Sequence, residues 1–330
     1  GPQIAASAAA LADRADGALL WARDADTPRA PGSAIKLMTA LAALETLSPQ
    51  DVVIVPPAAL IGEASMGLDA GEAVEVLTLL YGALLPSGND AAMTLALAGA
   101  GSEAAFVQRM NVRAAAWGLH GTHFATPHGL DAPGQVSTPR DLLALGRRAL
   151  DQPLLATIVS TSRISRQGYL LQNTNELLGL YAGAYGVKTG TTDEAGQVLI
   201  AAAARAGGDA LSVVMASPDR YADSRQLLDF YFAHWQRLEM QLPASALNRV
   251  ILPDGAIYTL QTPAQGAARP LLLQRWQAEQ ARVYRAITLD AAGAPLGVLQ
   301  IWLGPDKLAE LPLIFHRQRP PLPPTPTPLP

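Results

Sequence analysis

Residues 30–38 read APGSAIKLM, and they open the segment around which the fold is expected to form. We predict a helix over 33–47, where apolar residues fall on nearly all sides instead of along one stripe. A helix of this kind packs in the interior of a protein. Its first turn carries Ser33 and Lys36 three positions apart, so a polar pair is expected at a buried helix start.

This pair matters because lysine is rare in the chain. Among 24 basic residues there are three lysines, namely Lys36, Lys188 and Lys307. Residues three apart on a helix share a face, so Ser33 Oγ and Lys36 Nζ can meet. A serine hydroxyl needs a neighbouring base to become a nucleophile. Arginine cannot serve, whereas lysine can once burial or a second cation lowers its pKa by roughly 3 units.

The S-x-x-K spacing alone is a weak signal. It arises by chance about once in a chain of this length at average composition. On its own, Lys36 could equally be a solvated helix residue.

Two further motifs follow in order. PSGND at 86–90 places Ser87 and Asn89 where a helix begins, and a helix N-cap is the simpler interpretation. GVKTGTTDEAG at 186–196 places K-T-G of residues 188–190 on a strand, and an exposed edge strand entering a turn is the simpler interpretation. Together, S-x-x-K, S-G-N and K-T-G match the ordered triple of penicillin-binding proteins and class A β-lactamases, whose second member is S-D-N.

Composition limits the remaining possibilities. The 330 residues are 49% hydrophobic and 16% charged, as in a globular protein with a large core. A net charge of -4 without a basic run gives no electrostatic footprint for nucleic acid. The chain has no cysteine, which excludes disulfides and suits an oxidising compartment. No apolar run reaches the roughly 18 residues of a membrane-spanning helix.

The order of apolar runs predicts an α/β (α+β) fold, in which helices flank an antiparallel sheet in layers. Short runs separated by GTTDEAG and RAGGDA are expected to be antiparallel strands, and a helix is expected over 220–238. We predict one large domain over 1–238 and a small β-rich domain over 239–317. Residues 318–330 are expected to form a proline-rich tail in an extended conformation.

The chain resembles the low-molecular-mass penicillin-binding proteins that act as serine D-alanyl-D-alanine carboxypeptidases. The three motifs carry the resemblance, together with FATPHGLDAPGQVSTPRDLLAL at 124–145, LQNTNELL at 171–178 and DRYADSRQLLDFYF at 219–232. It covers about residues 3–235 well and 240–317 more weakly. It implies a penicillin-binding protein or serine β-lactamase-like fold, with 1–238 as a transpeptidase-like catalytic domain and the active site between the K-T-G strand and a helical subdomain.

The resemblance implies a catalytic role for five residues. Ser33 would attack the carbonyl between two terminal D-alanines, forming an acyl-enzyme, while Lys36 takes the hydroxyl proton. Ser87 and Lys188 would relay a proton to the leaving amine. Asn89 would orient the first lysine and the substrate amide.

The resemblance also implies substrate-binding residues. Thr189, Gly190 and Thr191 would bind the substrate, with the first of them holding its terminal carboxylate. The N–H groups of Ser33 and Thr191 would form an oxyanion hole, in which one donor is worth about 2.7 to 4 kcal/mol. Arg220 matches a family position near the carboxylate pocket, although a surface arginine in a first helical turn explains it nearly as well.

These roles imply a serine D,D-carboxypeptidase that removes the terminal D-alanine from peptidoglycan stem pentapeptides and is acylated by penicillin and other β-lactams. Gly32 stands where the family usually has alanine, and Thr191 where it often has a bulkier residue. No acidic motif of the class A β-lactamase kind follows S-G-N, so penicillin is expected to leave slowly. No metal or other cofactor is expected.

Three alternatives remain open at this point. His120, His123 and His128 could belong to a zinc hydrolase, although H-x-x-H without a nearby Glu base is weak. A D,D-endopeptidase acting on cross-links would use the same residues as a carboxypeptidase. A catalytically dead cell-wall binding protein would use the small domain and the tail.

The substrate implies a location. Stem peptides lie outside the cytoplasmic membrane, so the resemblance implies an exported bacterial protein at the extracytoplasmic membrane face, in the periplasm or in the cell wall. Family members are commonly held by a C-terminal amphipathic helix. We expect any such peripheral membrane anchor to lie outside this chain.

Overall fold

The computed structural model describes residues 1–242, 248–263 and 270–318. The chain divides into two compact units, one up to Ala233 and one from His234 onward. The domain limits that the sequence suggested, 1–238 and 239–317, stay a prediction. Of the expected proline-rich tail, residues 319–330 lie outside the described residues.

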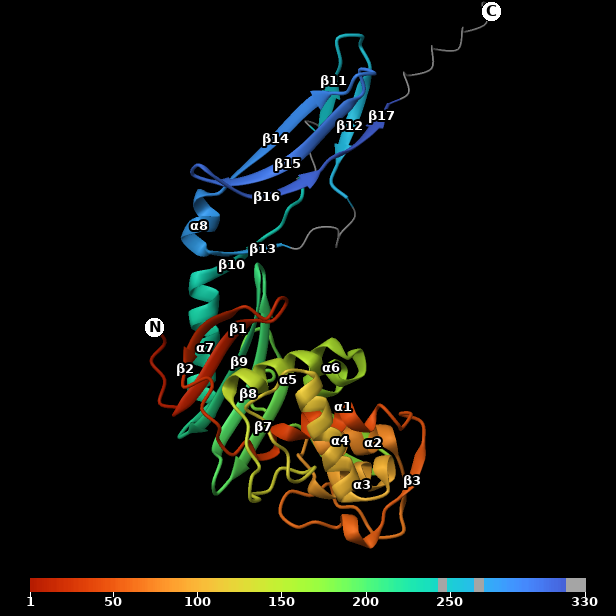
Figure 1. Ribbon diagram of the computed structural model, residues 1–330. Coiled ribbons are helices and arrows are strands. Elements are labelled where there is room, and N and C mark those ends of the chain that lie inside the picture. Colours follow the sequence, from red (N-terminus) through yellow and green to blue (C-terminus); the bar gives the residue numbers. More distant parts are fainter. Residues whose placement is uncertain (243–247, 264–269, 319–330) are drawn as a thin grey trace, which may run out of the picture. The chain divides into compact units, whose positions relative to one another are not determined.

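The first unit is built on a five-stranded antiparallel sheet of order β2-β1-β9-β8-β7 (Figure 1). The strands are β1 (Ala8–Asp13), β2 (Leu19–Arg23), β7 (Ala184–Thr192), β8 (Gly196–Arg205) and β9 (Gly208–Ser217). Two residues join β8 to β9, and Gly207 has the positive φ (83°) that such a turn requires. The predicted antiparallel sheet, including its Gly-Gly turn, is confirmed.

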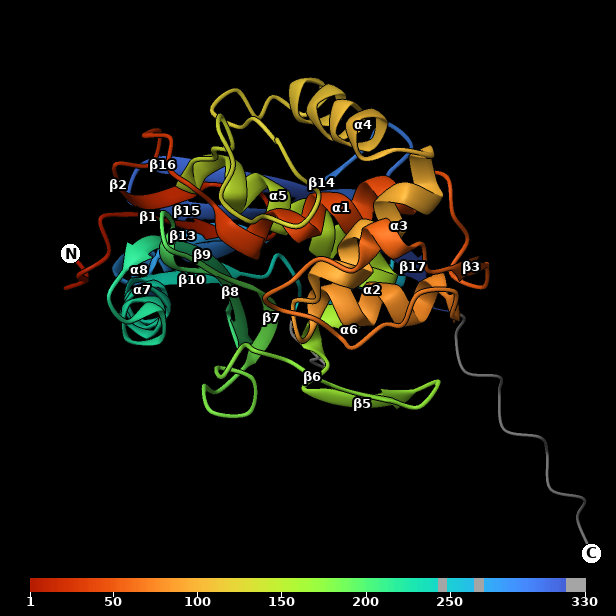
Figure 2. The same cartoon turned by 90° about the horizontal axis from the view of Figure 1, so that it is seen from below.

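Helices cover both faces of this sheet (Figure 2). Helix α5 (Pro139–Asp151) packs against β1 and β9 on one face, and α7 (Arg220–His234) lies on the other. On the α7 face, Tyr231 donates to the buried Asp13 carboxylate (2.5 Å). The layered arrangement that the sequence predicted is therefore present.

The helix that carries the first motif lies in the core, as predicted, but it is shorter than expected. A 3₁₀ turn, η1 (Gly32–Ile35), leads into α1 (Lys36–Ala43), whereas the prediction was one helix over 33–47. After Ala43 the backbone changes to hydrogen bonds of the 3₁₀ type, in which the N–H groups of Glu45 and Thr46 donate to the carbonyls three residues before them. Apolar side chains on all sides of α1 are buried, so its position in the core is confirmed.

The remaining elements of the first unit surround α1. The helices are η2 (Pro57–Ala59), α2 (Val76–Leu84), α3 (Asn89–Ala100), α4 (Glu103–Ala116) and α6 (Pro153–Ser160), and the two small hairpins are β3 (Val52–Ile54) with β4 (Ala73–Glu75) and β5 (Arg163–Arg166) with β6 (Tyr169–Gln172). Helices α2 to α5 contact α1. Helix α5 begins at a side-chain N-cap, since Thr138 Oγ1 accepts from Asp141 N (3.1 Å).

The second unit consists mainly of strands, as predicted. Its strands are β10 (Trp235–Leu238), β11 (Arg249–Ile251), β12 (Ile257–Gln261), β13 (Leu271–Gln274), β14 (Arg282–Leu289), β15 (Pro295–Leu303), β16 (Asp306–Pro312) and β17 (Ile314–Arg317). The helix expected over 220–238 ends at His234, because residues 235–238 pair with β13 instead. One turn of helix, α8 (Arg275–Gln280), was not expected. It begins where the Gln277 side chain accepts the Gln274 N–H (2.9 Å).

Candidate active site

The first motif places its serine and lysine side by side. Ser33 lies on η1 and Lys36 follows it at the start of α1. In a 3₁₀ turn, side chains three residues apart eclipse each other. The two side chains are buried, and Nζ of Lys36 lies 2.7 Å from Oγ of Ser33. The contact that the sequence predicted is therefore made, through a 3₁₀ turn instead of an α-helical one.

Lys36 is fully buried and contacts three oxygen atoms. Besides Ser33 Oγ, its Nζ donates to Asn89 Oδ1 (2.8 Å) and to the carbonyl of His128 (2.6 Å). Burial holds the pKa of Lys36 well below its usual range, and the positive charge of Lys188 lowers this pKa further. Asp90 and Glu63 act in the opposite direction. The balance favours a neutral amine, which can accept a proton from a hydroxyl.

The second motif supplies a hydrogen-bond acceptor for Lys36 and not a helix cap. Gly88 is the N-cap of α3 and no side chain caps this end, so the N-cap interpretation of PSGND is wrong. Asn89 is the first residue of α3 instead. Its side chain accepts from Lys36 and donates to the carbonyl of Gly62 (2.9 Å). The side-chain amide of Asn89 thus accepts from the lysine through its oxygen and donates to a neighbouring loop through its NH₂ group.

Ser87 and Lys188 join the second motif to the third. Nζ of Lys188 donates to Ser87 Oγ and to the carbonyl of Thr189, at 2.9 Å each. Strand β7 does form the edge of its sheet, but Lys188 on it is only 1% exposed. Burial lowers the pKa of Lys188 to about 7, and the nearby Arg220 guanidinium acts in the same direction. The lysine can therefore exchange a proton near neutral pH.

Two glycines allow β7 to approach η1. A Cβ on Gly190 would lie 2.9 Å from the carbonyl oxygen of Pro31 and 3.1 Å from Ser33 N. Gly32 has a positive φ (53°), and a Cβ on it would lie 3.2 Å from Thr191 N. A side chain on Gly190 would therefore displace its neighbours, and one on Gly32 would press against β7 and strain the backbone. The backbone N–H groups of the nucleophile turn and of the K-T-G strand are brought together in this way.

Arg220 belongs to the same cluster. Its Nη1 donates to the carbonyl of Gly190 (2.8 Å) and to Thr191 Oγ1 (2.9 Å), from the first turn of α7. The guanidinium is half-buried against the end of β7 and does not point freely into solvent. The interpretation of Arg220 as a simple surface residue is therefore not supported.

His128 is a site residue that the sequence did not assign to this chemistry. Its carbonyl accepts from Lys36, and Gly129 after it has a positive φ (93°). A Cβ on Gly129 would lie 2.4 Å from the carbonyl oxygen of Gly32, so this segment also packs against the nucleophile turn. Burial and the charge of Lys36 lower the pKa of His128 to about 4, so its ring is neutral at pH 7. The PHG sequence was the signal that could have indicated a tight backbone approach.

Asp90 is a second residue that the sequence did not single out. It follows Asn89 on α3, and its carboxylate accepts from Ser65 Oγ (2.5 Å) and from the backbone N–H groups of residues 66–68 (3.0–3.1 Å). Together with the bond from Asn89 to the carbonyl of Gly62, this holds segment 62–68 against α3. The segment is fixed next to the residues that surround Lys36.

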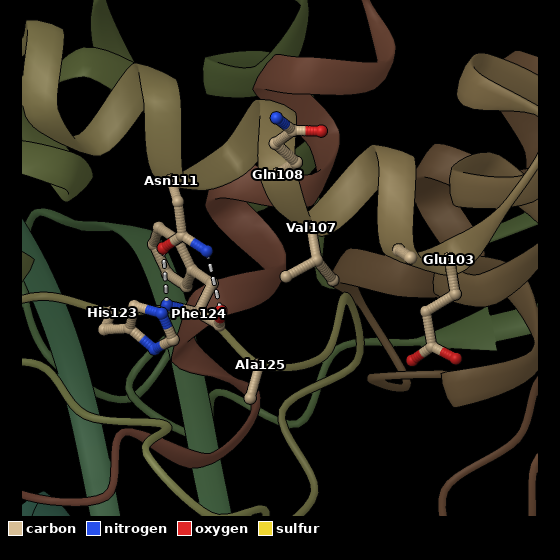
Figure 3. Close-up of a pocket in the computed structure, with 8 residues that line it drawn as sticks. Glu103, Val107, Gln108, Asn111, His123, Phe124 and Ala125 are labelled. Atoms are coloured by element: carbon tan, nitrogen blue, oxygen red, sulfur yellow. Dashed lines mark hydrogen bonds between the residues drawn. The ribbon is translucent and has the colours of Figure 1, made fainter.

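A pocket of about 640 Å³ lies between α4 and residues 123–125 (Figure 3). The Asn111 side chain exchanges two hydrogen bonds with the backbone of Phe124 in its wall (2.8 Å each). Glu103 at its rim lies 3.9 Å from the ring of His128. None of the motif residues lines this pocket.

The three histidines considered for zinc do not form a metal site. Within residues 1–242, 248–263 and 270–318, no three His, Cys, Asp or Glu side chains come close enough together to hold a metal ion. His123 Nδ1 contacts the carbonyl of Gly134 instead, and His128 Nδ1 accepts from Leu130 N. The zinc-hydrolase alternative therefore gains no support.

Comparison with known proteins is consistent with this geometry. The family described as D-alanyl-D-alanine carboxypeptidase matches residues 1–219. A D-alanyl-D-alanine carboxypeptidase of Streptomyces sp. is 36% identical over 258 residues, which cover 70% of this chain and 89% of that protein. The D-alanyl-D-alanine carboxypeptidase DacC of Escherichia coli is 30% identical over 338 residues, covering 95% of this chain and 84% of that protein.

A likeness among solved structures extends over both units. The structure of penicillin binding protein 5 from Haemophilus influenzae matches with a TM-score of 0.74 and 27% sequence identity. The match covers 96% of this chain and 97% of that one.

A first prediction concerns strain at Ser87, which has a positive φ (67°) that costs a non-glycine residue about 1 to 2 kcal/mol. Ser87→Ala and Ser87→Gly both remove the hydroxyl, but only glycine relieves the backbone. We expect the glycine variant to exceed the alanine variant by about 1 kcal/mol in free energy of unfolding, measured in urea. Equal stability of the two variants would show that this residue is not strained.

A second prediction follows from the pKa of Lys188, which is about 7 in the folded protein and near 10.5 when unfolded. Between these values the unfolded chain binds more protons, so stability rises with pH, by at most about 1.4 kcal/mol per pH unit for this group. Lys188→Met should weaken the rise between pH 7 and 9 in urea unfolding. The exposed Lys307→Met serves as control and should leave it unchanged. An unaltered pH dependence in Lys188→Met would contradict the lowered pKa.

Proposed function

The chain belongs to the D-alanyl-D-alanine carboxypeptidase family, and from this premise we propose that Ser33 is the nucleophile of a serine D,D-carboxypeptidase acting on stem peptides that end in D-Ala-D-Ala. The observation that carries the assignment is the 2.7 Å contact between Ser33 Oγ and the buried amine of Lys36. This contact and the lowered pKa of Lys36 favour an enzyme over a binding protein without activity.

Acylation begins with proton transfer from Ser33 to Lys36. The neutral amine takes the hydroxyl proton as Oγ bonds to the carbonyl carbon of the penultimate D-alanine. Asn89 and the carbonyl of His128 keep Nζ in place through its other two contacts. The nucleophile and its base are thus already positioned before the substrate binds.

The negative charge of the tetrahedral intermediate falls on the former carbonyl oxygen. We assign its stabilisation to the N–H groups of Ser33 and Thr191. The close packing of Gly190 and Gly32 supports this, because it brings β7 and η1 within van der Waals contact. Backbone donors that are fixed in advance stabilise such a charge without reorganisation.

The leaving amine requires a proton when the C–N bond breaks. Ser87 Oγ is placed to donate it and to regain a proton from Lys188 at 2.9 Å. A lysine with a pKa of about 7 can give up this proton at neutral pH. D-alanine then leaves as the free amino acid, and the acyl group remains as an ester on Ser33.

The terminal carboxylate of the substrate is assigned to Thr189 and the charges near it. Lys188 and Arg220 place two cationic groups at this end of β7. Arg220 also fixes the strand end through its bonds to Gly190 and Thr191. Substrates with a C-terminal carboxylate, and β-lactams that carry the same group, would be selected in this way.

Water hydrolyses the ester slowly when the acyl group is a penicillin. The carboxylate of Asp90, one of the two that act electrostatically on Lys36, is engaged by Ser65 and three backbone N–H groups. It is therefore not free to activate a water molecule as a general base. The engaged state of Asp90 supports the expectation that the penicillin adduct is long-lived.

The proposed substrate places the enzyme at the cell wall, outside the cytoplasmic membrane. In the described parts of the chain, no helix is both long enough and apolar enough to cross a bilayer.

The nucleophile is tested by intact mass. Incubation with benzylpenicillin should add the mass of one penicillin to the protein, and this adduct should be lost only slowly. The same incubation should add nothing to Ser33→Ala. The unmodified enzyme should release D-alanine from a stem pentapeptide. Rapid turnover of benzylpenicillin, or an adduct on the alanine variant, would contradict the assignment.

The base is tested by replacing Lys36 with a side chain that cannot lose its proton. Lys36→Arg introduces a permanent cation and cannot supply a neutral amine, because the arginine pKa stays above about 12. Loss of general-base catalysis should lower the rate constant for penicillin acylation at least about a hundredfold. Lys307→Arg, the same change at an exposed salt bridge with Glu310, should have no effect. Near-normal acylation of Lys36→Arg would refute the role of Lys36.

A further inference from the structure

Thr174 is a polar residue next to the K-T-G strand to which no role has been given above. It lies in the connection between β6 and β7, outside S-x-x-K, S-G-N and K-T-G. Its Oγ1 lies 2.6 Å from Oγ1 of Thr189. Thr174 is exposed, whereas Thr189 is only 5% exposed. The hydroxyl of an exposed residue is therefore hydrogen-bonded to the proposed carboxylate-binding residue.

The backbone of Thr174 is tied to two other parts of the site. Its N–H donates to the carbonyl of Leu85 (3.1 Å), two residues before Ser87. Its own carbonyl accepts from the hydroxyl of Tyr221 (2.6 Å), which follows Arg220 on α7. Thr174 thus connects the S-G-N turn, the K-T-G strand and the start of α7.

The direction of the hydrogen bond between the two threonines decides what Thr189 can bind. Each hydroxyl has one proton. If Thr189 donates to Thr174, no proton remains for a substrate carboxylate. If Thr174 donates to Thr189, the Thr189 proton is free to be donated to an anion. Thr174 Oγ1 can also donate to the Leu85 carbonyl, but this contact is longer (3.3 Å) than its contact with Thr189 Oγ1 (2.6 Å).

We propose that Thr174 is a positioning residue for substrate recognition, whose hydroxyl donates to Thr189 and so directs the Thr189 proton toward the terminal carboxylate. This inference rests on the proposed function. It gives the enzyme specificity for acyl donors that carry a free carboxylate. The effect is on binding and orientation of that group, and not on the Ser33–Lys36 proton transfer.

The test compares Thr174→Val, which keeps the branched shape and removes the hydroxyl, with Thr174→Ser, which keeps the hydroxyl. The carboxylate-bearing substrate is diacetyl-L-lysyl-D-alanyl-D-alanine, and the probe without a carboxylate is p-nitrophenyl acetate. For Thr174→Val we expect kcat/KM with the peptide to fall about tenfold, mainly through KM, since one hydrogen bond to a charged group is lost. Activity toward the ester should stay unchanged, and the serine variant should restore the peptide KM.

Thr157→Val on α6 is the matched control, because the Thr157 hydroxyl donates to the carbonyl of Pro153 within its own helix. It should leave both activities unchanged. An unchanged peptide KM in Thr174→Val would overturn the inference, as would equal losses for peptide and ester or a failure of serine to restore binding. The proposed function fails differently, through absence of D-alanine release or of a Ser33 adduct in the unmodified enzyme.

Discussion

The site depends on one constraint, which is that an amine must be kept uncharged next to an alcohol in the protein interior. Removing Lys36 from water disfavours its ammonium form, and a second buried lysine adds repulsion. Each partner of Nζ comes from a different part of the chain: Ser33 on η1, Asn89 on α3 and His128 in the loop before α5. The fold of the first unit is what brings these three oxygen atoms to one nitrogen.

A second requirement is close contact between backbones. Gly32, Gly190 and Gly129 stand where three segments meet, and a Cβ at any of them would collide with, or press against, a main chain. Missing side chains are as important here as functional groups, because backbone N–H groups can serve a reaction only if nothing separates them from it. This explains why the motif that contributes a lysine and a threonine to the sheet edge also ends in glycine.

From the sequence, the chemistry of the site could be predicted better than the local geometry of the backbone could. Ser33 and Lys36 could be paired from their spacing on a predicted helix, whereas the pairing of Ser87 with Lys188 was implied only by the resemblance to a known family. Short apolar runs between turns predicted the antiparallel sheet. The helix over 33–47 was drawn too long, because apolar periodicity does not distinguish a 3₁₀ turn from an α-turn. An N-cap was the simpler interpretation of PSGND by itself, because the same side chains can cap a helix or contact a lysine. The resemblance carried by all three motifs implied the contact between Asn89 and Lys36, which the structure contains. The role of His128 lies in its carbonyl oxygen, which every residue has, so no side-chain pattern could reveal it.

Asp90 illustrates how the course of a segment beside the site is fixed. Its carboxylate accepts hydrogen bonds from the main-chain N–H groups of residues 66–68. Most of its contacts are therefore with the backbone of this segment and not with its side chains. The path of this segment therefore depends on one carboxylate and little on the side chains that the segment itself carries outward, so those side chains can differ while the backbone beside the site keeps its course.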